Sequence, residues 1–163
     1  MSEPVQKPPM PDAAWAIAQT IPSPEIAIAE KQAYFGLRWQ VTPVLYAFNT
    51  HRGARPWRAF IAEPGIRQAG SIEAFASPEY LAIGSSAPGR WSLRLGTRAY
   101  FPVLEHGEYL SFSLGTSYST FAGGGVGYEG GVYVLFGVLG IQVTYSPSPL
   151  QPPVIVTLRF RYF

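Results

Sequence analysis

The chain has 163 residues, of which 13% are charged and 15% aromatic, and its formal net charge at pH 7 is +2. A typical soluble domain carries about 25% charged residues, so the composition indicates an unusually apolar surface. The absence of cysteine excludes disulfides and thiol catalysis, and the lack of any run of about 20 apolar residues excludes a transmembrane helix.

The first 31 residues differ in composition from the rest. They hold six prolines, both lysines and the only aspartate of the chain, and closely spaced prolines do not allow long regular structure. We expect residues 1–31 to be a Pro-rich flexible tail; the functional alternative is a tail that docks a partner, or folds onto the barrel mouth, through Trp15 and Ile17. The tail lacks the basic start and apolar core of a secretory signal.

Residues 32–163 predict antiparallel β-strands separated by Gly- and Pro-rich turns. In residues 90–103 and 109–118, apolar side chains alternate with Arg, Ser and Gly. Because a strand sends successive side chains to opposite faces, each run has one apolar and one polar face. We predict eight strands, at residues 33–48, 56–62, 66–83, 90–104, 108–120, 126–136, 141–145 and 154–163.

Two prolines interrupt these strands. Pro43 predicts a bulge, because proline has no amide hydrogen for the ladder. Pro78 predicts a second bulge that shifts the alternation, so that Leu81 and Ile83 lead the apolar face.

The apolar faces carry aromatic residues near the strand ends, and the other faces combine small residues with arginine. This pattern is typical of a barrel with lipid outside and a polar interior. We therefore predict an all-β fold, a closed antiparallel up-and-down transmembrane β-barrel of about eight strands. The aromatic residues expected at the membrane interface are Trp39, Trp57, Trp91, Tyr118, Tyr145 and Tyr162.

With this alternation and the aromatic C-terminus Arg159-Phe160-Arg161-Tyr162-Phe163, residues 33–163 resemble small bacterial outer-membrane β-barrels of the eight-stranded OmpA-, OmpX- and OmpW-like class. The resemblance implies a location in the outer membrane after removal of a signal peptide, a periplasmic tail, and membrane lipids and the barrel-assembly machinery as partners. In that class the last residue is usually a phenylalanine on the apolar face of the final strand. Here Phe163 falls instead on the face of Arg159 and Arg161.

Inward-facing charges are the candidate site. An eight-stranded barrel is just wide enough for side chains to fill it, and buried charges must be paired. We expect an Arg/Glu network that closes the lumen, made of Arg38, Glu73, Arg94, Arg98, Glu129, Arg159 and Arg161.

Catalytic and metal sites have weak support. We expect His51 and His106 to lie in turns at opposite ends of the barrel, so they cannot share a site. The only arrangement favouring a lipid-modifying hydrolase or acyltransferase is His51 with Ser85 or Ser86. We therefore predict no enzyme, no metal and no cofactor. The arginines are spread along the strands, which argues against nucleic-acid binding.

The expected function is structural. A closed barrel with short loops favours an anchoring role, with residues 1–31 contacting a periplasmic protein or a larger assembly. The alternative is a carrier of a small apolar ligand or lipid, aided by Phe75, Tyr109 and Tyr133. A soluble eight-stranded barrel of the lipocalin kind is a third interpretation, in which the two faces exchange roles.

Overall fold

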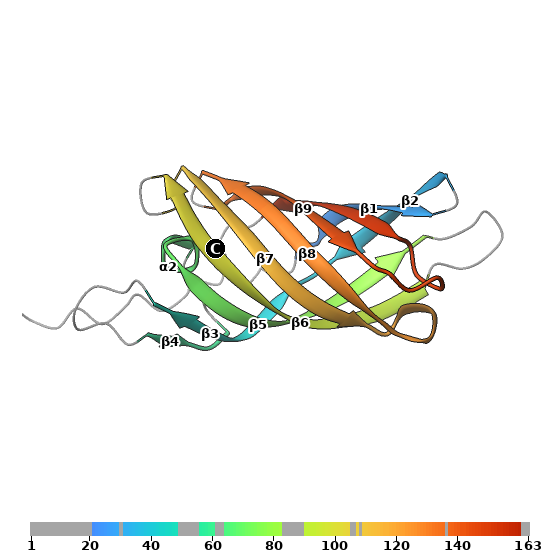
Figure 1. Ribbon diagram of the computed structural model, residues 1–163, viewed down its shortest axis with the longest axis horizontal. Coiled ribbons are helices and arrows are strands. Elements are labelled where there is room, and N and C mark those ends of the chain that lie inside the picture. Colours follow the sequence, from blue (N-terminus) through green and yellow to red (C-terminus); the bar gives the residue numbers. More distant parts are fainter. Residues whose placement is uncertain are drawn as a thin grey trace, which may run out of the picture.

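The chain forms a closed β-barrel. The computed structural model describes residues 21–29, 31–48, 56–60, 64–82, 90–104, 107, 109–135 and 137–160. Eight antiparallel strands form a ring in the order β2-β1-β10-β9-β8-β7-β6-β5, and pairing of β2 with β5 closes it (Figure 1). Their bounds are β1 (Ser23–Ala29), β2 (Gln32–Arg38), β5 (Ser71–Leu81), β6 (Arg90–Leu104), β7 (Leu110–Ser119), β8 (Gly125–Val134), β9 (Leu139–Tyr145) and β10 (Val154–Phe160). The predicted all-β fold, a closed antiparallel barrel of eight strands, is confirmed.

The barrel has two different ends. β1 starts and β10 finishes at one of them, which we call the terminal end (left in Figure 1). The turn between β1 and β2 lies at the opposite end, which we call the far end.

The ring has eight strands, as predicted, but they are not the same eight segments that the sequence predicted. Ser23–Ala29, which we expected in the tail, forms β1 and pairs with both β2 and β10. The expected strand at residues 56–62 is only β4 (Trp57–Arg58), which pairs with β3 outside the ring. The barrel therefore begins before residue 32. Pro22 and Pro24 argued against a strand in this segment. Pro24 nevertheless keeps its place in the ladder, opposite Leu37.

The strand expected at residues 33–48 is divided in two. β2 ends at Arg38, β3 (Val41–Ala47) continues along β5, and Trp39 and Gln40 separate them. The register shifts between Val41 and Val44, which confirms the bulge predicted at Pro43.

The second predicted bulge is wrong. β5 pairs with β6 without a register shift from Ser71 to Leu81, so Pro78 keeps its place in the ladder. The backbone oxygen of Pro78 accepts a 3.0 Å hydrogen bond from the amide of Trp39. A strand residue directs its N and O to the same side, so the missing amide hydrogen of Pro78 faces the interruption between β2 and β3 and no ladder bond to β6 is lost. The alternation therefore continues unchanged. Leu81 consequently points inward and is 1% exposed.

Short segments cover both ends. Residues 66–68, expected as the start of a strand, belong to helix α2 (Pro64–Gln68) at the terminal end, where Ile66 packs against Leu45 and Ala47. At the far end, the 3-10 helix η2 (Phe121–Gly123) places Phe121 in an apolar cluster with Ala27, Leu81 and Ile155. Among the described residues, no helix is long and apolar enough to cross a bilayer.

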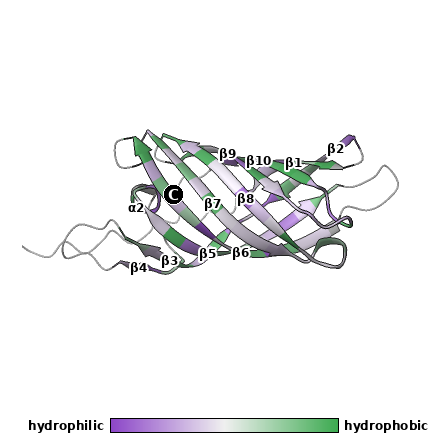
Figure 2. Ribbon diagram, viewed as in Figure 1, coloured by the Kyte–Doolittle hydropathy of each residue, from purple (hydrophilic) through white to green (hydrophobic). Residues whose placement is uncertain are grey.

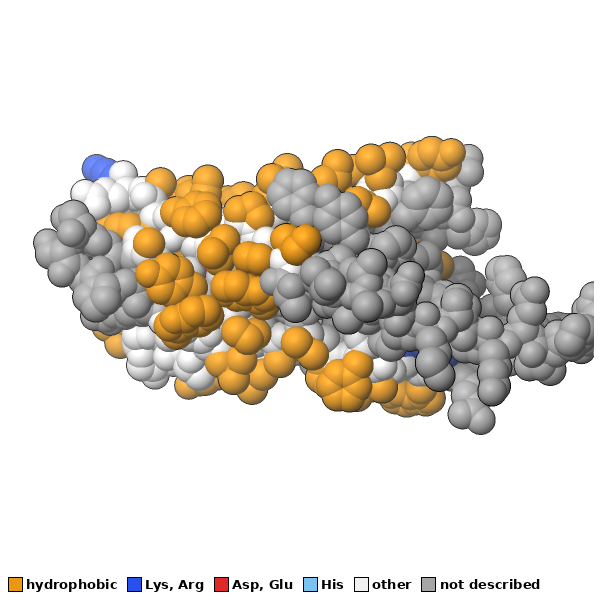
Figure 3. Space-filling model, turned by 180° about the vertical axis from the view of Figure 1, so that it is seen from behind, with side chains coloured by type: hydrophobic (Ala, Val, Ile, Leu, Met, Phe, Trp, Pro, Cys, Tyr) orange, Lys and Arg blue, Asp and Glu red, His pale blue; other side chains and the backbone are white. Residues whose placement is uncertain are grey.

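Side chains are distributed in the opposite sense to a water-soluble domain. Hydropathy alternates along the strands in Figure 2, and hydrophobic side chains gather on the outer face in Figure 3. Large apolar residues such as Trp91 and Leu114 are 66% and 58% exposed. The interior instead holds serines, threonines, glutamates and arginines.

Candidate functional site

The interior of the barrel contains charged side chains from six ring strands. Alternation along each strand directs them inward, and glycines on neighbouring strands leave the space. At Gly96, an added methyl group would lie 2.7 Å from Cζ of Phe75 and 2.5 Å from the backbone oxygen of Thr116. The absence of a side chain at Gly96 therefore makes room for Phe75 in the lumen.

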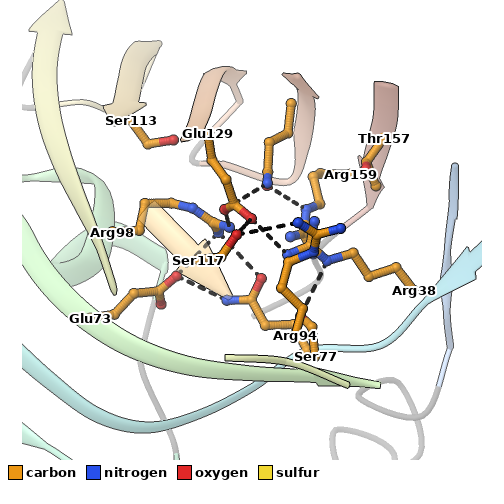
Figure 4. Close-up of polar contacts among 12 residues, drawn as sticks. Arg38, Glu73, Ser77, Arg94, Arg98, Ser113, Ser117, Glu129, Thr157 and Arg159 are labelled. Atoms are coloured by element: carbon orange, nitrogen blue, oxygen red, sulfur yellow. Dashed lines mark hydrogen bonds and ion pairs between the residues drawn. The ribbon is translucent and has the colours of Figure 1, made fainter. Parts of the chain in front are cut away.

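Glu129 on β8 is the centre of this ion-pair network (Figure 4). Its Oε1 lies 3.2 Å from Nη2 of Arg38 and accepts a 2.9 Å hydrogen bond from Ser117 Oγ. Its Oε2 pairs with Nη2 of Arg98 and accepts a 2.9 Å hydrogen bond from Gln142 Nε2. One carboxylate thus joins β2, β6, β7 and β9 across the lumen.

Glu73 on β5 is a second branching point, nearer the terminal end. Its Oε1 accepts hydrogen bonds from Tyr100 OH at 2.8 Å and Arg98 Nη1 at 3.3 Å. Its other contacts come from the segment after β2 and from α2, the helix before β5: Gln40 Nε2 at 2.9 Å, Thr42 Oγ1 at 3.0 Å and Arg67 Nε at 3.2 Å. Arg98 therefore connects Glu73 to Glu129.

Glu79 extends the network towards the far end. Arg94 binds it through two nitrogens, with Nε 2.6 Å from Oε1 and Nη2 3.2 Å from Oε2. Nε of Arg38 lies 3.1 Å from the same Oε1. Arg38 thus links Glu79 to Glu129, so the pairs form one continuous chain.

Aromatic and amide side chains fill the remaining space. The guanidinium carbon of Arg98 lies 4.5 Å from the Phe75 ring centroid, and that of Arg38 lies 5.7 Å from it. Cations above an aromatic face are attracted to it, so Phe75 occupies the space between two arginines. Nε of Arg159 donates a 2.9 Å hydrogen bond to Gln142 Oε1, and Gln142 in turn donates to Glu129, so Gln142 links Arg159 to Glu129.

This arrangement holds a barrel together better than it binds a substrate. The three carboxylates are each contacted by two or more donors, and all are at most 3% exposed. Buried ion pairs offset their desolvation only when geometry and further hydrogen bonds are favourable, and the three carboxylates meet both conditions. Side chains occupy the centre of the lumen.

The structure places the predicted lumen residues in a single connected set, except for one. Arg38, Glu73, Arg94, Arg98 and Glu129 are linked by ion pairs, and Arg159 joins through Gln142. Arg161 lies outside the described residues.

Sequence reasoning missed three buried charges: Glu25, Glu79 and Arg67. Glu25 was assigned to the tail, and Arg67 to a strand that is a helix. Glu79 could have been predicted from the sequence. Every second residue after Glu73 faces inward if Pro78 causes no bulge, and Glu79 is one of these residues.

The expected interface aromatics lie on the outside. Trp57, Trp91, Tyr118 and Tyr145 are at least half exposed, and the half-buried Trp39 stacks on Trp91 at 5.6 Å between centroids. Tyr162 and the tail residues Trp15 and Ile17 lie outside the described residues.

The side chains considered for ligand carriage do not converge. Tyr109 is exposed on the outside, Phe75 contacts the two arginines, and Tyr133 packs on Tyr100 at 5.5 Å between centroids. These three side chains therefore do not form one apolar pocket.

The two histidines and the serines considered with them, His51, His106, Ser85 and Ser86, lie outside the described residues. The strands that precede the histidines in the chain, β3 and β6, both finish at the terminal end, whereas we expected them to lead to opposite ends. β5, which precedes Ser85 and Ser86, finishes at the far end. In the described part of the chain, no group of three His, Cys, Asp or Glu could hold a metal ion.

Comparison with protein-family models, curated proteins and solved structures finds no significant match to this chain. The functional argument therefore depends on the physical chemistry of the barrel.

Proposed function

We propose that this chain is an integral outer-membrane β-barrel with a structural or anchoring role, whose lumen is closed and whose N-terminal segment contacts a periplasmic partner or a larger assembly. The observation that carries the proposal is the inverted polarity of the barrel. On the eight ring strands, every charged side chain whose exposure is described is at most 3% exposed: Glu25, Arg38, Glu73, Glu79, Arg94, Arg98, Glu129 and Arg159.

Lipid explains this distribution better than water does. Lipid-facing positions of such barrels are apolar and the lumen-facing positions are polar, whereas charged residues of water-soluble proteins are mostly exposed. A closed ring also leaves no unpaired strand edge in hydrocarbon. The soluble lipocalin-like interpretation would require charges outside and an apolar interior.

The anchoring role follows from the filled lumen. A barrel of eight strands is too narrow for an aqueous pore, and the ion-pair network crosses its centre. The described chain starts at Ile21, at the same end at which β10 finishes. The residues that precede Ile21 connect to the barrel at this end, which supports assigning the partner contact to them.

The first test is the mobility of detergent-refolded protein on an SDS gel, loaded unheated and boiled. We expect the unheated band to migrate differently from the boiled band, because a closed membrane barrel resists SDS until heated. The experiment includes a plain-buffer refolding as control. Good solubility in plain buffer together with identical mobilities would overturn the membrane proposal.

A further inference from the structure

Helix α2 (Pro64–Gln68) lies against the terminal end of the barrel (Figure 1). Its two C-terminal side chains are buried, with Arg67 at 5% and Gln68 at 2% exposure. The helix therefore separates part of the polar lumen from water.

Polar contacts hold α2 in place. Ser111 Oγ on β7 donates a hydrogen bond to Gln68 Oε1, and Ser71 Oγ donates one to the backbone oxygen of Arg67 at 2.9 Å. The guanidinium of Arg67 reaches inward to Glu73, with 3.2 Å between Nε and Oε2.

Two turns of the barrel are shaped to receive Gln68. Gly107, after β6, and Gly137, after β8, have φ values of +88° and +78°. A methyl group on Gly107 would overlap the carbonyl of Gln68, and one on Gly137 would overlap its side-chain amide. Glycine at both turns thus allows close contact with α2.

The attachment of α2 differs from that of the ring strands. Each ring strand is held by ladders of backbone hydrogen bonds on both sides. The contacts described for α2 are of another kind: the bonds above, a 3.4 Å hydrogen bond from Arg67 Nη2 to Thr42 Oγ1, the close approach of Gln68 to Gly107 and Gly137, and the packing of Ile66. Segments with few buried apolar contacts open at lower free energy than the rest of a protein.

Release of α2 would also leave the network intact. When Arg67 withdraws from Glu73, the carboxylate keeps hydrogen bonds from Gln40, Thr42 and Tyr100 and its contact with Arg98. Opening therefore does not leave a buried carboxylate without donors, which would be the main cost of removing a charged partner.

We propose that α2 is a releasable strap that controls access of water and small polar solutes to the half of the lumen at the terminal end. With the strap released, a vestibule opens that is bounded by Glu73, Tyr100 and Ser111. The layer of Arg38 and Glu129 closes its inner side, and the apolar cluster around Phe121 closes the far end. The vestibule admits solutes without forming a channel.

The test uses single cysteines, since the chain has none of its own. Ser113→Cys, opposite Tyr100 on the inward face of β7, reports from beneath the strap without removing a contact of α2, and Ser119→Cys is the matched control on the inward face of the same strand, beyond the network. Each is combined with Gln68→Ala, and the labelling rate by a charged maleimide is measured on folded protein in detergent micelles. Ser71→Cys replaces Ser113→Cys if the latter lacks the folded gel mobility.

We expect Ser113→Cys to react in the folded barrel and to react up to about tenfold faster with Gln68→Ala, because the hydrogen bond between Ser111 and Gln68 that holds the closed state is lost. Ser119→Cys should keep the same rate in both backgrounds. The proposal is overturned if Ser113→Cys reacts only after thermal unfolding, if Gln68→Ala leaves its rate unchanged, or if both cysteines accelerate equally. The assay needs neither membrane nor partner, so its failure is distinct from failure of the proposed function.

Discussion

At the scale of single residues, the stability of the interior depends on carboxylates that each bind several strands. Glu129 is contacted from β2, β6, β7 and β9, and it separates Arg38 from Arg98. Removing one partner of a buried ion pair leaves an uncompensated charge, which costs more than the pair itself contributes. Glu129 is therefore the residue whose loss should affect the barrel most.

Glu129→Ala should lower the free energy of unfolding by about 3–5 kcal/mol, because two buried guanidinium groups lose a shared counter-charge. Urea titration of tryptophan fluorescence in detergent or lipid vesicles measures this change. Val126→Ala, on the outward face of the same strand, should change it by less than about 1 kcal/mol. Equal urea midpoints for Glu129→Ala and the unmodified chain would show that the network does not stabilise the fold.

At the scale of elements, β1 decides whether the ring is closed. It supplies pairing partners to β10 from Glu25 to Ile28 and to β2 from Ser23 to Ala29. Without β1, β10 and β2 would each present an unpaired edge, which lipid does not satisfy and which promotes aggregation in water. The barrel thus begins near residue 21, and deletion experiments need to treat residues 1–20 separately from β1.

Deletion of residues 1–20 should preserve the heat-dependent gel shift, whereas deletion of residues 1–31 should abolish it, because only the longer deletion removes β1. If the N-terminal segment contacts a partner, the shorter deletion should also abolish cross-linking to periplasmic proteins that the full chain recovers. A gel shift retained by the longer deletion would contradict the role of β1. Unchanged cross-linking by the shorter one would contradict the partner contact.

At the scale of the whole molecule, substitutions on the outer surface distinguish a barrel embedded in lipid from a barrel in water. Leu114 lies in the middle of β7 and Leu150 lies in the segment between β9 and β10, and they are 58% and 67% exposed. In water the two leucines are nearly equivalent surface positions. In a bilayer, Leu114 faces the hydrocarbon and Leu150 lies near the interface.

Leu114→Arg should therefore reduce the stability of the barrel in lipid vesicles by about 2–4 kcal/mol, and Leu150→Arg by only about 0–1 kcal/mol. Reversible urea unfolding in vesicles provides the measurement, and the pair forms its own control because the substitution is the same. Small and equal effects of both substitutions would contradict a transmembrane position for β7.

The sequence by itself determined most of the ring strands, their inward polar faces and the all-β class, because alternation with period two is a local property of each strand. It also indicated Arg38, Glu73, Arg94, Arg98, Glu129 and Arg159 as inward-facing, and the structure connects these residues. Only the tertiary structure decided that Ser23–Ala29 and not the segment near Trp57 belongs to the ring, since ring closure depends on pairing between residues more than 100 positions apart. The same long-range pairing set which end each loop faces. It also made residues 64–68 a short helix, held by Ser111 and two turn glycines that no local pattern associates with them.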